Sequence, residues 1–336
     1  MRHRMTAACL TTACLTAAFL TCLPSMMLAD PVRVQPIDCT LGEDCYIQYY
    51  VDRDASDGVL DFGCGALSYN GHKGTDFALI SLDQMAQGVD VLSAAPGVVR
   101  GTRDGMADQL YSKETAEAVA GRECGNGVAI DHGGGWVTQY CHMKKGSLQV
   151  KTGQRVAANA VLGQVGLSGK TQFPHLHISV RHQDQVVDPF APYSNTCNAG
   201  LDEALWRDVP AYLPGGLIDL GFALKVPEYS EIKAGRAHTH QLDQSAPALV
   251  TWAYAYGSQP GDILHLSLFG PADGDAPGPR VLEKRILLDK AQSLFFRAIG
   301  RKRPATGWAP GRYQATAKLI RNSAVLGERQ VWVELR

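Results

Sequence analysis

The sequence predicts a mainly β protein, in which an antiparallel β-sheet domain is followed by a small β-sandwich. From about residue 63 to residue 190, short apolar runs are separated by glycine and asparagine, which is the pattern of strands joined by tight turns. After residue 197, roughly seven further strand-like runs are separated by turn signals, which is typical of a sandwich.

In the first series, strands are expected where β-branched and aromatic residues gather between polar turns. These runs lie at residues 98–100, 128–130, 136–140, 161–163 and 176–180. The stretch Ala107–Arg122 differs, because charged and amide side chains stand between alanines. We expect a helical or irregular insertion there.

In the second series, a short segment at 201–206 is long enough for one or two helical turns. The strands that follow are expected at residues 216–224, 248–256, 263–269, 280–288, 293–299, 313–320 and 329–335. Trp252, Tyr254 and Tyr256 alternate along one of them and therefore share one face of the strand. They could line a sugar-binding face, although an alternating core face is the commoner arrangement.

The composition excludes several classes of protein. The 336 residues include 45% hydrophobic and 19% charged residues, with 32 Lys and Arg against 33 Asp and Glu. A disordered chain, a collagen-like chain and a polytopic membrane protein are therefore excluded. Because the charges balance and no long basic run occurs, nucleic-acid binding is not expected.

The N-terminus has the pattern of an export signal. Arg2 and Arg4 precede an apolar run from about Ala7 to Leu23, and Asp30 follows a plausible cleavage site after Ala29. A retained membrane anchor is the alternative, but the run is interrupted by threonines and is at the lower edge of spanning length. Lipid attachment at Cys22 fits poorly, because a small residue is expected before the cysteine and Thr21 stands there. We expect a periplasmic or secreted protein with no stable membrane anchor after cleavage.

The cysteines support export. Of the nine, Cys9, Cys14 and Cys22 lie in the leader, and removing it leaves an even set, which in an exported chain suggests disulfides. The remaining six are Cys39, Cys45, Cys64, Cys124, Cys141 and Cys197. We expect Cys39 to pair with Cys45 and Cys124 with Cys141, the alternative being that some are free buried thiols.

Two histidine clusters are the residues most suited to metal chemistry. His72 and Asp76 are four residues apart, and His175 and His177 are two apart in a strand-like run, so they can face one site together. A third histidine, His142, follows another expected strand. Imidazole and carboxylate are good zinc ligands, and three protein ligands plus a water form the open arrangement of catalytic zinc. If His72, Asp76 and one histidine of the pair hold the metal, two histidines remain for proton transfer during amide hydrolysis.

The other histidines are expected to be structural. His132 lies in a glycine-rich turn, and His238 and His240 repeat the two-residue spacing without an accompanying carboxylate–histidine motif. Tyr140 could face a substrate-binding groove beside these histidines, or it could be a packed core aromatic.

The stretch from about Gly63 to Pro189 resembles the M23 (lysostaphin/LytM-type) zinc metallopeptidases, which cut peptide bonds in bacterial peptidoglycan. The resemblance rests on segments in the order of the family that span about 125 residues. These are residues 71–77, 94–99, 125–133, 140–143, 153–156, 162–166, 174–177 and 187–189. Two departures affect the groove rather than the ligands: Phe173 stands where the family often has glycine, and the insertion at 107–122 is longer than in compact members.

The resemblance implies roles for five residues. His72, Asp76 and His177 would be the ligands of a Zn²⁺ cofactor, and His142 and His175 would be catalytic, activating water and stabilising the tetrahedral oxyanion. It also implies a LytM/lysostaphin-type peptidase fold. The expected organisation is a signal peptide at 1–29, a lead segment at 30–61, the peptidase domain at 62–197 and a C-terminal β-sandwich of unknown role at 200–336.

The function implied is that of an exported zinc metalloendopeptidase whose partner is the stem peptides and cross-links of peptidoglycan. Export with disulfides fits a Gram-negative periplasm. Members of the family of that kind cut D-alanyl–diaminopimelate cross-links, so the resemblance favours this bond. Two alternatives remain: a non-catalytic LytM-type regulator of other cell-wall hydrolases, and a secreted endopeptidase acting on glycine-rich peptides or proteins. Degenerate regulators lose metal ligands, whereas this sequence keeps all five expected positions.

Overall fold

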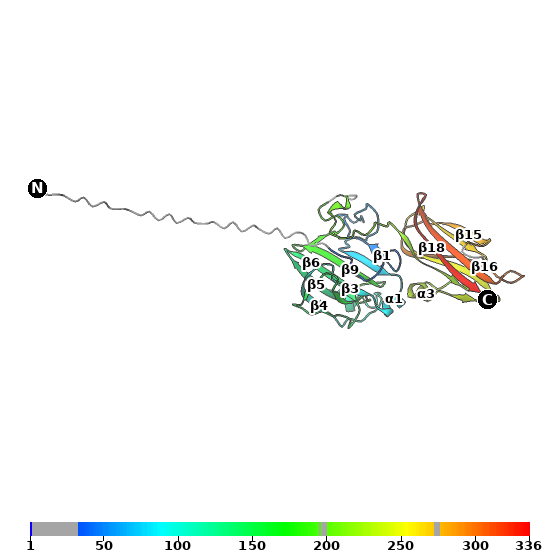
Figure 1. The fold of residues 1–336 in the computed structure, drawn as a ribbon, viewed down its shortest axis with the longest axis horizontal. Coiled ribbons are helices and arrows are strands. Elements are labelled where there is room, and N and C mark those ends of the chain that lie inside the picture. Colours follow the sequence, from blue (N-terminus) through cyan, green and yellow to red (C-terminus); the bar gives the residue numbers. More distant parts are fainter. Residues whose placement is uncertain (2–32, 195, 197–199, 272–275) are drawn as a thin grey trace. The chain divides into compact units, whose positions relative to one another are not determined.

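The computed structural model describes Met1 and residues 33–336, apart from residues 195, 197–199 and 272–275 (Figure 1). Residues 31–336 form one compact unit. The expected signal peptide, beyond Met1, lies outside the described residues, and so does Cys197. Within the described part of the chain, no helix has the length and apolar character needed to cross a membrane.

The first half of this unit is built on one antiparallel eight-stranded sheet. Its order is β1 (Cys45–Tyr49), β2 (Thr75–Leu79), β9 (His175–His182), β6 (Trp136–Met143), β5 (Asn126–Gly133), β4 (Gly97–Arg103) and β7 (Arg155–Val156), with β10 (Gln185–Val187) paired to β9. A two-stranded sheet joins β3 (Asp90–Leu92) to β8 (Val161–Gln164). The five strands expected from the sequence are all present.

Helices are few in this half. α1 (Leu82–Gln87) begins at Ser81, whose hydroxyl accepts a hydrogen bond from the backbone N–H of Gln84. α2 (Ala116–Val119) is the only regular element between residues 107 and 122. The insertion is thus largely irregular with one helical turn, as predicted.

The second half is a sandwich of two sheets. One has the order β11 (Gly216–Ala223), β13 (Ala248–Ser258), β16 (Gln292–Lys302). The other has the order β12 (Gln241–Leu242), β18 (Ala324–Leu335), β17 (Gly311–Arg321), β14 (Ile263–Phe269), β15 (Arg280–Leu287). All seven runs predicted as strands are strands. A turn of 3₁₀ helix at Leu201–Glu203 and the short helix α3 (Tyr229–Ala234) precede or interrupt them.

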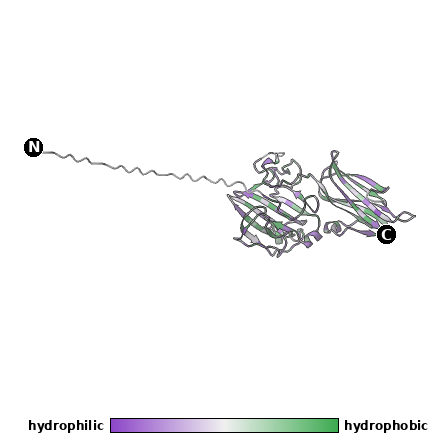
Figure 2. Ribbon diagram, viewed as in Figure 1, coloured by the Kyte–Doolittle hydropathy of each residue, from purple (hydrophilic) through white to green (hydrophobic). Residues whose placement is uncertain are grey.

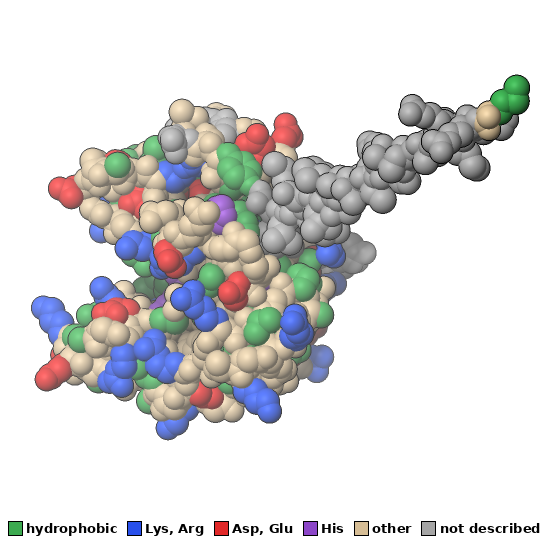
Figure 3. Space-filling view, turned by 90° about the vertical axis from the view of Figure 1, so that its left-hand side faces the viewer, with side chains coloured by type: hydrophobic (Ala, Val, Ile, Leu, Met, Phe, Trp, Pro, Cys, Tyr) green, Lys and Arg blue, Asp and Glu red, His purple; other side chains and the backbone are tan. Residues whose placement is uncertain are grey.

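The core of the sandwich is formed by side chains that alternate between the two faces of each strand. Leu264 and Leu266 of β14 and Leu319 of β17 are fully buried, and they pack with Phe295 of β16 in one hydrophobic cluster between the sheets. In Figure 2 the hydrophobic residues, in green, gather along the strands of both halves. Over the face drawn in Figure 3, basic and acidic side chains are interspersed, as the balanced charge predicts.

The three alternating aromatics of β13 belong to the core. Trp252, Tyr254 and Tyr256 are at most 4% exposed, which contradicts a sugar-binding face. They are part of a hydrophobic cluster that also contains the core of the eight-stranded sheet, and the ring of Tyr256 lies 4.6 Å from that of Tyr46 in β1. One continuous core therefore joins the two halves.

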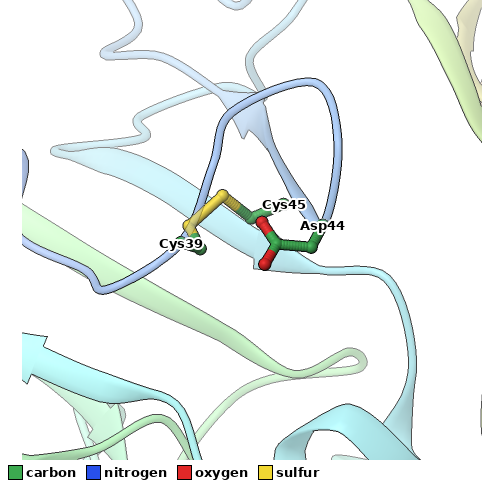
Figure 4. Close-up of side chains that lie close together, drawn as sticks. All are labelled: Cys39, Asp44 and Cys45. Atoms are coloured by element: carbon green, nitrogen blue, oxygen red, sulfur yellow. A yellow bond between two sulfur atoms is a disulfide. The ribbon is translucent and has the colours of Figure 1, made fainter.

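The disulfide prediction is confirmed for both pairs. Cys39 is bonded to Cys45, and Cys124 is bonded to Cys141. Cys64 is disulfide-bonded as well, so the alternative of free thiols is wrong for these five cysteines. Asp44 lies beside the first disulfide (Figure 4), where its carboxylate accepts a hydrogen bond from the backbone N–H of Thr40 at 2.6 Å.

Candidate metal centre

The pairing of β2 with β9 brings two of the expected ligands face to face. Asp76 of β2 lies directly opposite His177 of β9 in the ladder. Residues opposite each other in an antiparallel pair have adjacent side chains, so residues about 100 positions apart in sequence meet at one point. His72, in the turn before β2, completes the group, since its Nδ1 donates a hydrogen bond to the carbonyl of Tyr50 at 2.7 Å.

The three side chains converge on one small volume. Asp76 Oδ1 lies 3.2 Å from His72 Nε2 and 2.8 Å from His177 Nδ1, and the two nitrogens are 3.1 Å apart. His72 and Asp76 are each 2% exposed, whereas His177 is partly exposed. Two of the three ligand side chains are therefore buried in the fold, and the group reaches solvent on the side of His177.

Gly74 permits this approach. A Cβ at that position would lie 2.6 Å from Cε1 and Nε2 of His177 and 2.6 Å from the carbonyl oxygen of Ile178. Real Cβ atoms do not come that close to other atoms. The glycine between His72 and Asp76 is thus needed because the imidazole of His177 packs against its backbone.

His175 and His142 are positioned beside this group by backbone carbonyls. His175 Nδ1 donates to the carbonyl of Phe173 at 3.0 Å, and its Nε2 lies 3.6 Å from Asp76 Oδ1. His142 Nδ1 donates to the carbonyl of Ser168 at 2.8 Å. The rings of His142 and His175 are 4.6 Å apart, and both residues are at most 7% exposed. With Nδ1 donating, each imidazole presents Nε2 as its available lone pair.

The backbone at His142 is strained. Its φ is 62°, which places a non-glycine residue in the left-handed region. Two bonds hold His142 in this conformation. Its backbone N–H donates a hydrogen bond to the carbonyl of Cys124 at 2.8 Å, and a disulfide joins Cys124 to the preceding residue, Cys141. Strained residues held by their surroundings concentrate at functional sites.

The pKa values of the ligand group and those of the two flanking histidines are shifted by different dominant effects. Burial alone would raise the pKa of Asp76, but charge on His72 and His175 and hydrogen bonds from His177 and His72 hold it well below its ordinary value. Burial opposes protonation of His72, yet the Asp76 carboxylate outweighs it and raises the pKa of His72.

For the two flanking residues burial dominates. It lowers the pKa of His142 well below its ordinary value, with added repulsion from His175 and His177. It also lowers the pKa of His175, although Asp76 acts in the opposite direction. At neutral pH both are therefore uncharged imidazoles that can accept a proton.

The group of His72, Asp76 and His177 could hold a metal ion, since each offers one ligand atom within 4.8 Å of the others. Tetrahedral zinc with bonds of about 2.0–2.2 Å places neighbouring ligand atoms roughly 3.3 Å apart. The observed separations of 2.8, 3.1 and 3.2 Å are close to this spacing. Two imidazoles and a carboxylate are also a donor set that zinc accepts, so the residues fit such a metal.

A second group, Cys39, Asp44 and Cys45, has similar spacing. It does not suit a metal, because both sulfurs are consumed by the disulfide seen in Figure 4.

The metal centre opens into a cavity of about 960 Å³. Its lining includes Asp76, His142 and His175, together with groups that sequence reasoning did not select, such as Tyr49, Tyr69 and Thr171. Of these three, only Tyr49 carried a local signal, as part of the tyrosine-rich stretch at residues 46–50. Phe173 and the insertion residues Leu110 and Tyr111 also line the cavity, so the two departures noted in the sequence do shape it.

The remaining candidates lie elsewhere. His132 bonds to the carbonyl of Pro96 and the hydroxyl of Thr138, consistent with a structural role. Tyr140 is fully buried and its hydroxyl accepts from the backbone N–H of Ala94, so it is a core residue and does not face the groove. His238 does have a carboxylate partner, Asp219 at 2.7 Å, which the sequence spacing did not reveal.

A buried group of two histidines and an aspartate, flanked by two neutral histidines at a groove, is typical of a metal-dependent hydrolase. Residues 70–189 match the model of Peptidase family M23. This segment is an M23-family peptidase domain.

Curated relatives match about a third of this chain. Peptidoglycan DD-endopeptidase ShyA of Vibrio cholerae is 35% identical over 106 residues, which are 32% of this chain and 19% of that protein. Cell division protein DipM of Caulobacter vibrioides is 34% identical over 109 residues, or 32% of this chain and 15% of that protein. The chain thus spans a quarter or less of the curated relatives that it matches.

Two solved structures are also similar to part of this chain. The catalytic domain of the prophage-encoded M23 protein EnpA from Enterococcus faecalis is 20% identical, covering 45% of this chain and 92% of that one, with a TM-score of 0.31. The catalytic domain of lysostaphin from Staphylococcus simulans is 22% identical, covering 35% and 76%, with a TM-score of 0.25.

Proposed function

We propose that this chain is an exported zinc metalloendopeptidase that hydrolyses peptide cross-links of bacterial peptidoglycan, with the D-alanyl–diaminopimelate bond as the favoured target. The observation that carries the proposal is the convergence of Asp76, His72 and His177 within 3.2 Å beside two buried, neutral histidines. The similarity to a peptidoglycan endopeptidase supports the substrate class. The domain limits given above and the export signal are part of this proposal.

In this proposal His72, Asp76 and His177 hold the zinc ion. Zinc bound there supplies Lewis acidity, which polarises the scissile carbonyl and lowers the pKa of water. The hydrogen bond from His72 Nδ1 to the Tyr50 carbonyl selects the tautomer that leaves Nε2 free for the metal.

His142 and His175 carry the proton. The Nε2 lone pair of one accepts a proton from the attacking water, and the resulting imidazolium delivers it to the leaving amine nitrogen. The other histidine would take up a proton and, as an imidazolium, donate a hydrogen bond to the negative charge that develops on the carbonyl oxygen. The lowered pKa values of both histidines ensure that the accepting form is present at neutral pH. A non-catalytic regulator would have no need to keep all five residues in this arrangement.

The test is mass spectrometry of purified sacculi digested with residues 30–336, with and without a zinc chelator. We expect chelator-sensitive loss of cross-linked dimers, and the new termini identify the bond. His177→Ala should abolish cleavage and metal binding, whereas His240→Ala, at an exposed histidine, should change neither. Zinc-loaded, folded protein that leaves every muropeptide intact would refute the proposal.

A further inference from the structure

One wall of the cavity at the metal centre comes from the sandwich half of the chain. Tyr229 and Lys233 of α3 line it, and so do Lys290 and the residues that begin β16, as far as Leu294. Phe173 and Lys170, from the loop before β9, line it as well. The groove is therefore assembled from residues 49–175 and residues 229–294, and the peptidase segment 70–189 alone does not contain it.

This wall is anchored to the sheet that carries the metal ligands. The side-chain amide of Gln48, a fully buried residue of β1, donates a hydrogen bond to the carbonyl of Ser293 at 3.1 Å. Leu294 and Phe296 pack against the hydrophobic cluster that includes the core of the eight-stranded sheet. Separating the wall from the groove would expose that shared core, so its side chains stay in place beside the metal centre.

The charge of this cavity is one-sided. Lys170, Lys233 and Lys290 line it, and within the described part of the chain Asp76 is the only acidic residue that does so. The ion-pair partners of the Asp76 carboxylate, among residues that the structure describes, are all histidines. Among the described residues, none of the three ammonium groups has a carboxylate within 4.0 Å, although Lys233 Nζ lies 5.1 Å from the ring centre of Tyr229 and Lys170 Nζ 5.8 Å from that of Tyr111.

Three ammonium groups without an ion-pair partner within 4.0 Å among the described residues line one cavity and attract negative charge, although Glu123, which does not line the cavity, interacts with Lys170 at longer range. A cleft lined by one sign of charge focuses the field and raises the local concentration of ligands of the opposite sign. The remaining polar lining includes the amides of Gln172 and Gln292 and the tyrosine hydroxyls, which suit a peptide backbone. Neither an uncharged polyglycine nor a basic peptide would make use of the lysines.

We propose that Lys170, Lys233 and Lys290 form a carboxylate-binding rim that selects peptides bearing free carboxylates in the groove of the metal centre. This inference rests on the proposed endopeptidase function and specifies its substrate: an acidic, branched or cross-linked peptide rather than a glycine-rich one. The sandwich half thereby supplies two of the three specificity-determining side chains.

The first arm of the test is binding without catalysis. Metal-free residues 30–336 are titrated into a rhodamine-labelled peptide of alanine, glycine and one glutamate, which carries two free carboxylates, and into its fully amidated twin. Fluorescence anisotropy is followed at several salt concentrations. We expect the acidic peptide to bind more tightly and with marked salt dependence. Each lysine is worth roughly 2- to 5-fold, so Lys170→Gln/Lys233→Gln/Lys290→Gln should weaken binding about 10- to 100-fold.

Lys225→Gln is the matched control, since Lys225 is an exposed lysine of the same half that does not line the cavity. It should bind like the unsubstituted protein, and circular dichroism establishes that every variant is folded. Equal affinity for the acidic and amidated peptides, or no effect of the triple substitution, overturns the inference.

The second arm is hydrolysis by the zinc-loaded protein of cross-linked muropeptides with free or amidated carboxylates. The triple variant should raise KM for the acidic substrate with kcat nearly unchanged. Cleavage of both substrates with equal KM would overturn the carboxylate rim and leave the endopeptidase standing. Salt-dependent binding of the acidic peptide without cleavage of any muropeptide would instead refute the endopeptidase function and support the rim as a binding site.

Discussion

Substituting alanine for Gly74 tests the metal centre at a position that supplies none of its ligands. The new methyl group would lie 2.6 Å from two ring atoms of His177 and 2.6 Å from the Ile178 carbonyl oxygen, where ordinary contacts begin at 3.4 Å. Something must move by about 0.8 Å, and the ladder pair of Thr75 with Ile178 resists movement of the backbone. The imidazole of His177 is therefore displaced.

A displacement of that size exceeds the tolerance of metal–ligand distances, which is about 0.2 Å. We expect Gly74→Ala to weaken zinc binding at least 10- to 100-fold and to lower the free energy of unfolding by about 1–3 kcal/mol through overpacking. Competition with a chromophoric chelator measures the first, and urea denaturation of the metal-free protein measures the second.

Gly101→Ala is the matched control. Gly101 lies in β4 of the same sheet, and a Cβ there would meet no atom within 4 Å. It should bind zinc normally and unfold within about 0.5 kcal/mol of the unsubstituted protein. The reasoning fails if Gly74→Ala binds zinc as tightly as Gly101→Ala.

Three further predictions concern stability. Replacing Cys124 and Cys141 by alanine should lower the free energy of unfolding by about 3 kcal/mol, because the disulfide closes a loop of 17 residues; a urea midpoint unchanged at constant slope would contradict this. Burial raises the pKa of Asp188 to about 6, so the folded state binds its proton more tightly than the unfolded state and stability falls as pH rises from about 4 to 6. Relative to Asp188→Asn, the unsubstituted protein should lose up to about 3 kcal/mol over that interval, and parallel pH profiles of the two would refute the assignment. Arg321→Met should cost about 3–5 kcal/mol, since it leaves Asp262, 1% exposed, as an unpaired buried charge; thermal unfolding of Arg321→Met/Asp262→Leu should show recovery of most of the loss.

Much of the fold could be predicted because its signals are local. Alternation of side chains along a strand and glycine in turns are properties of a few consecutive residues, so all twelve expected strands were found, five in the first half and seven in the second. The elements that the sequence did not predict are two to six residues long and carry too little pattern to stand out; they are β1, β2, β3, β7, β10, β12, α1 and α3. The disulfides were predictable where the cysteines close a short loop or flank a hairpin.

For the candidate site as well, local sequence predicts some features and the tertiary structure sets the others. The sequence by itself determined the residue types, because His72 stands four residues from Asp76 and the two-residue spacing of His175 and His177 places that pair on one face of a strand. From spacing alone, either histidine of the second pair could be the ligand. The register of β2 on β9 sets the order of distances: His177 Nδ1 lies 2.8 Å from Asp76 Oδ1, whereas His175 Nε2 lies at 3.6 Å.

Only the tertiary structure decided what surrounds the metal centre. The contact of Gln48 with Ser293 joins residues 245 positions apart, and the lysines at 170, 233 and 290 share one cavity although nothing in their local sequence relates them. Local patterns specify strands, but which strands share a core is decided by the burial of all of their apolar faces at once. For this protein, short segments of the sequence therefore determined which residues can bind a metal. The packing of one half of the chain on the other determined the shape and charge of the groove.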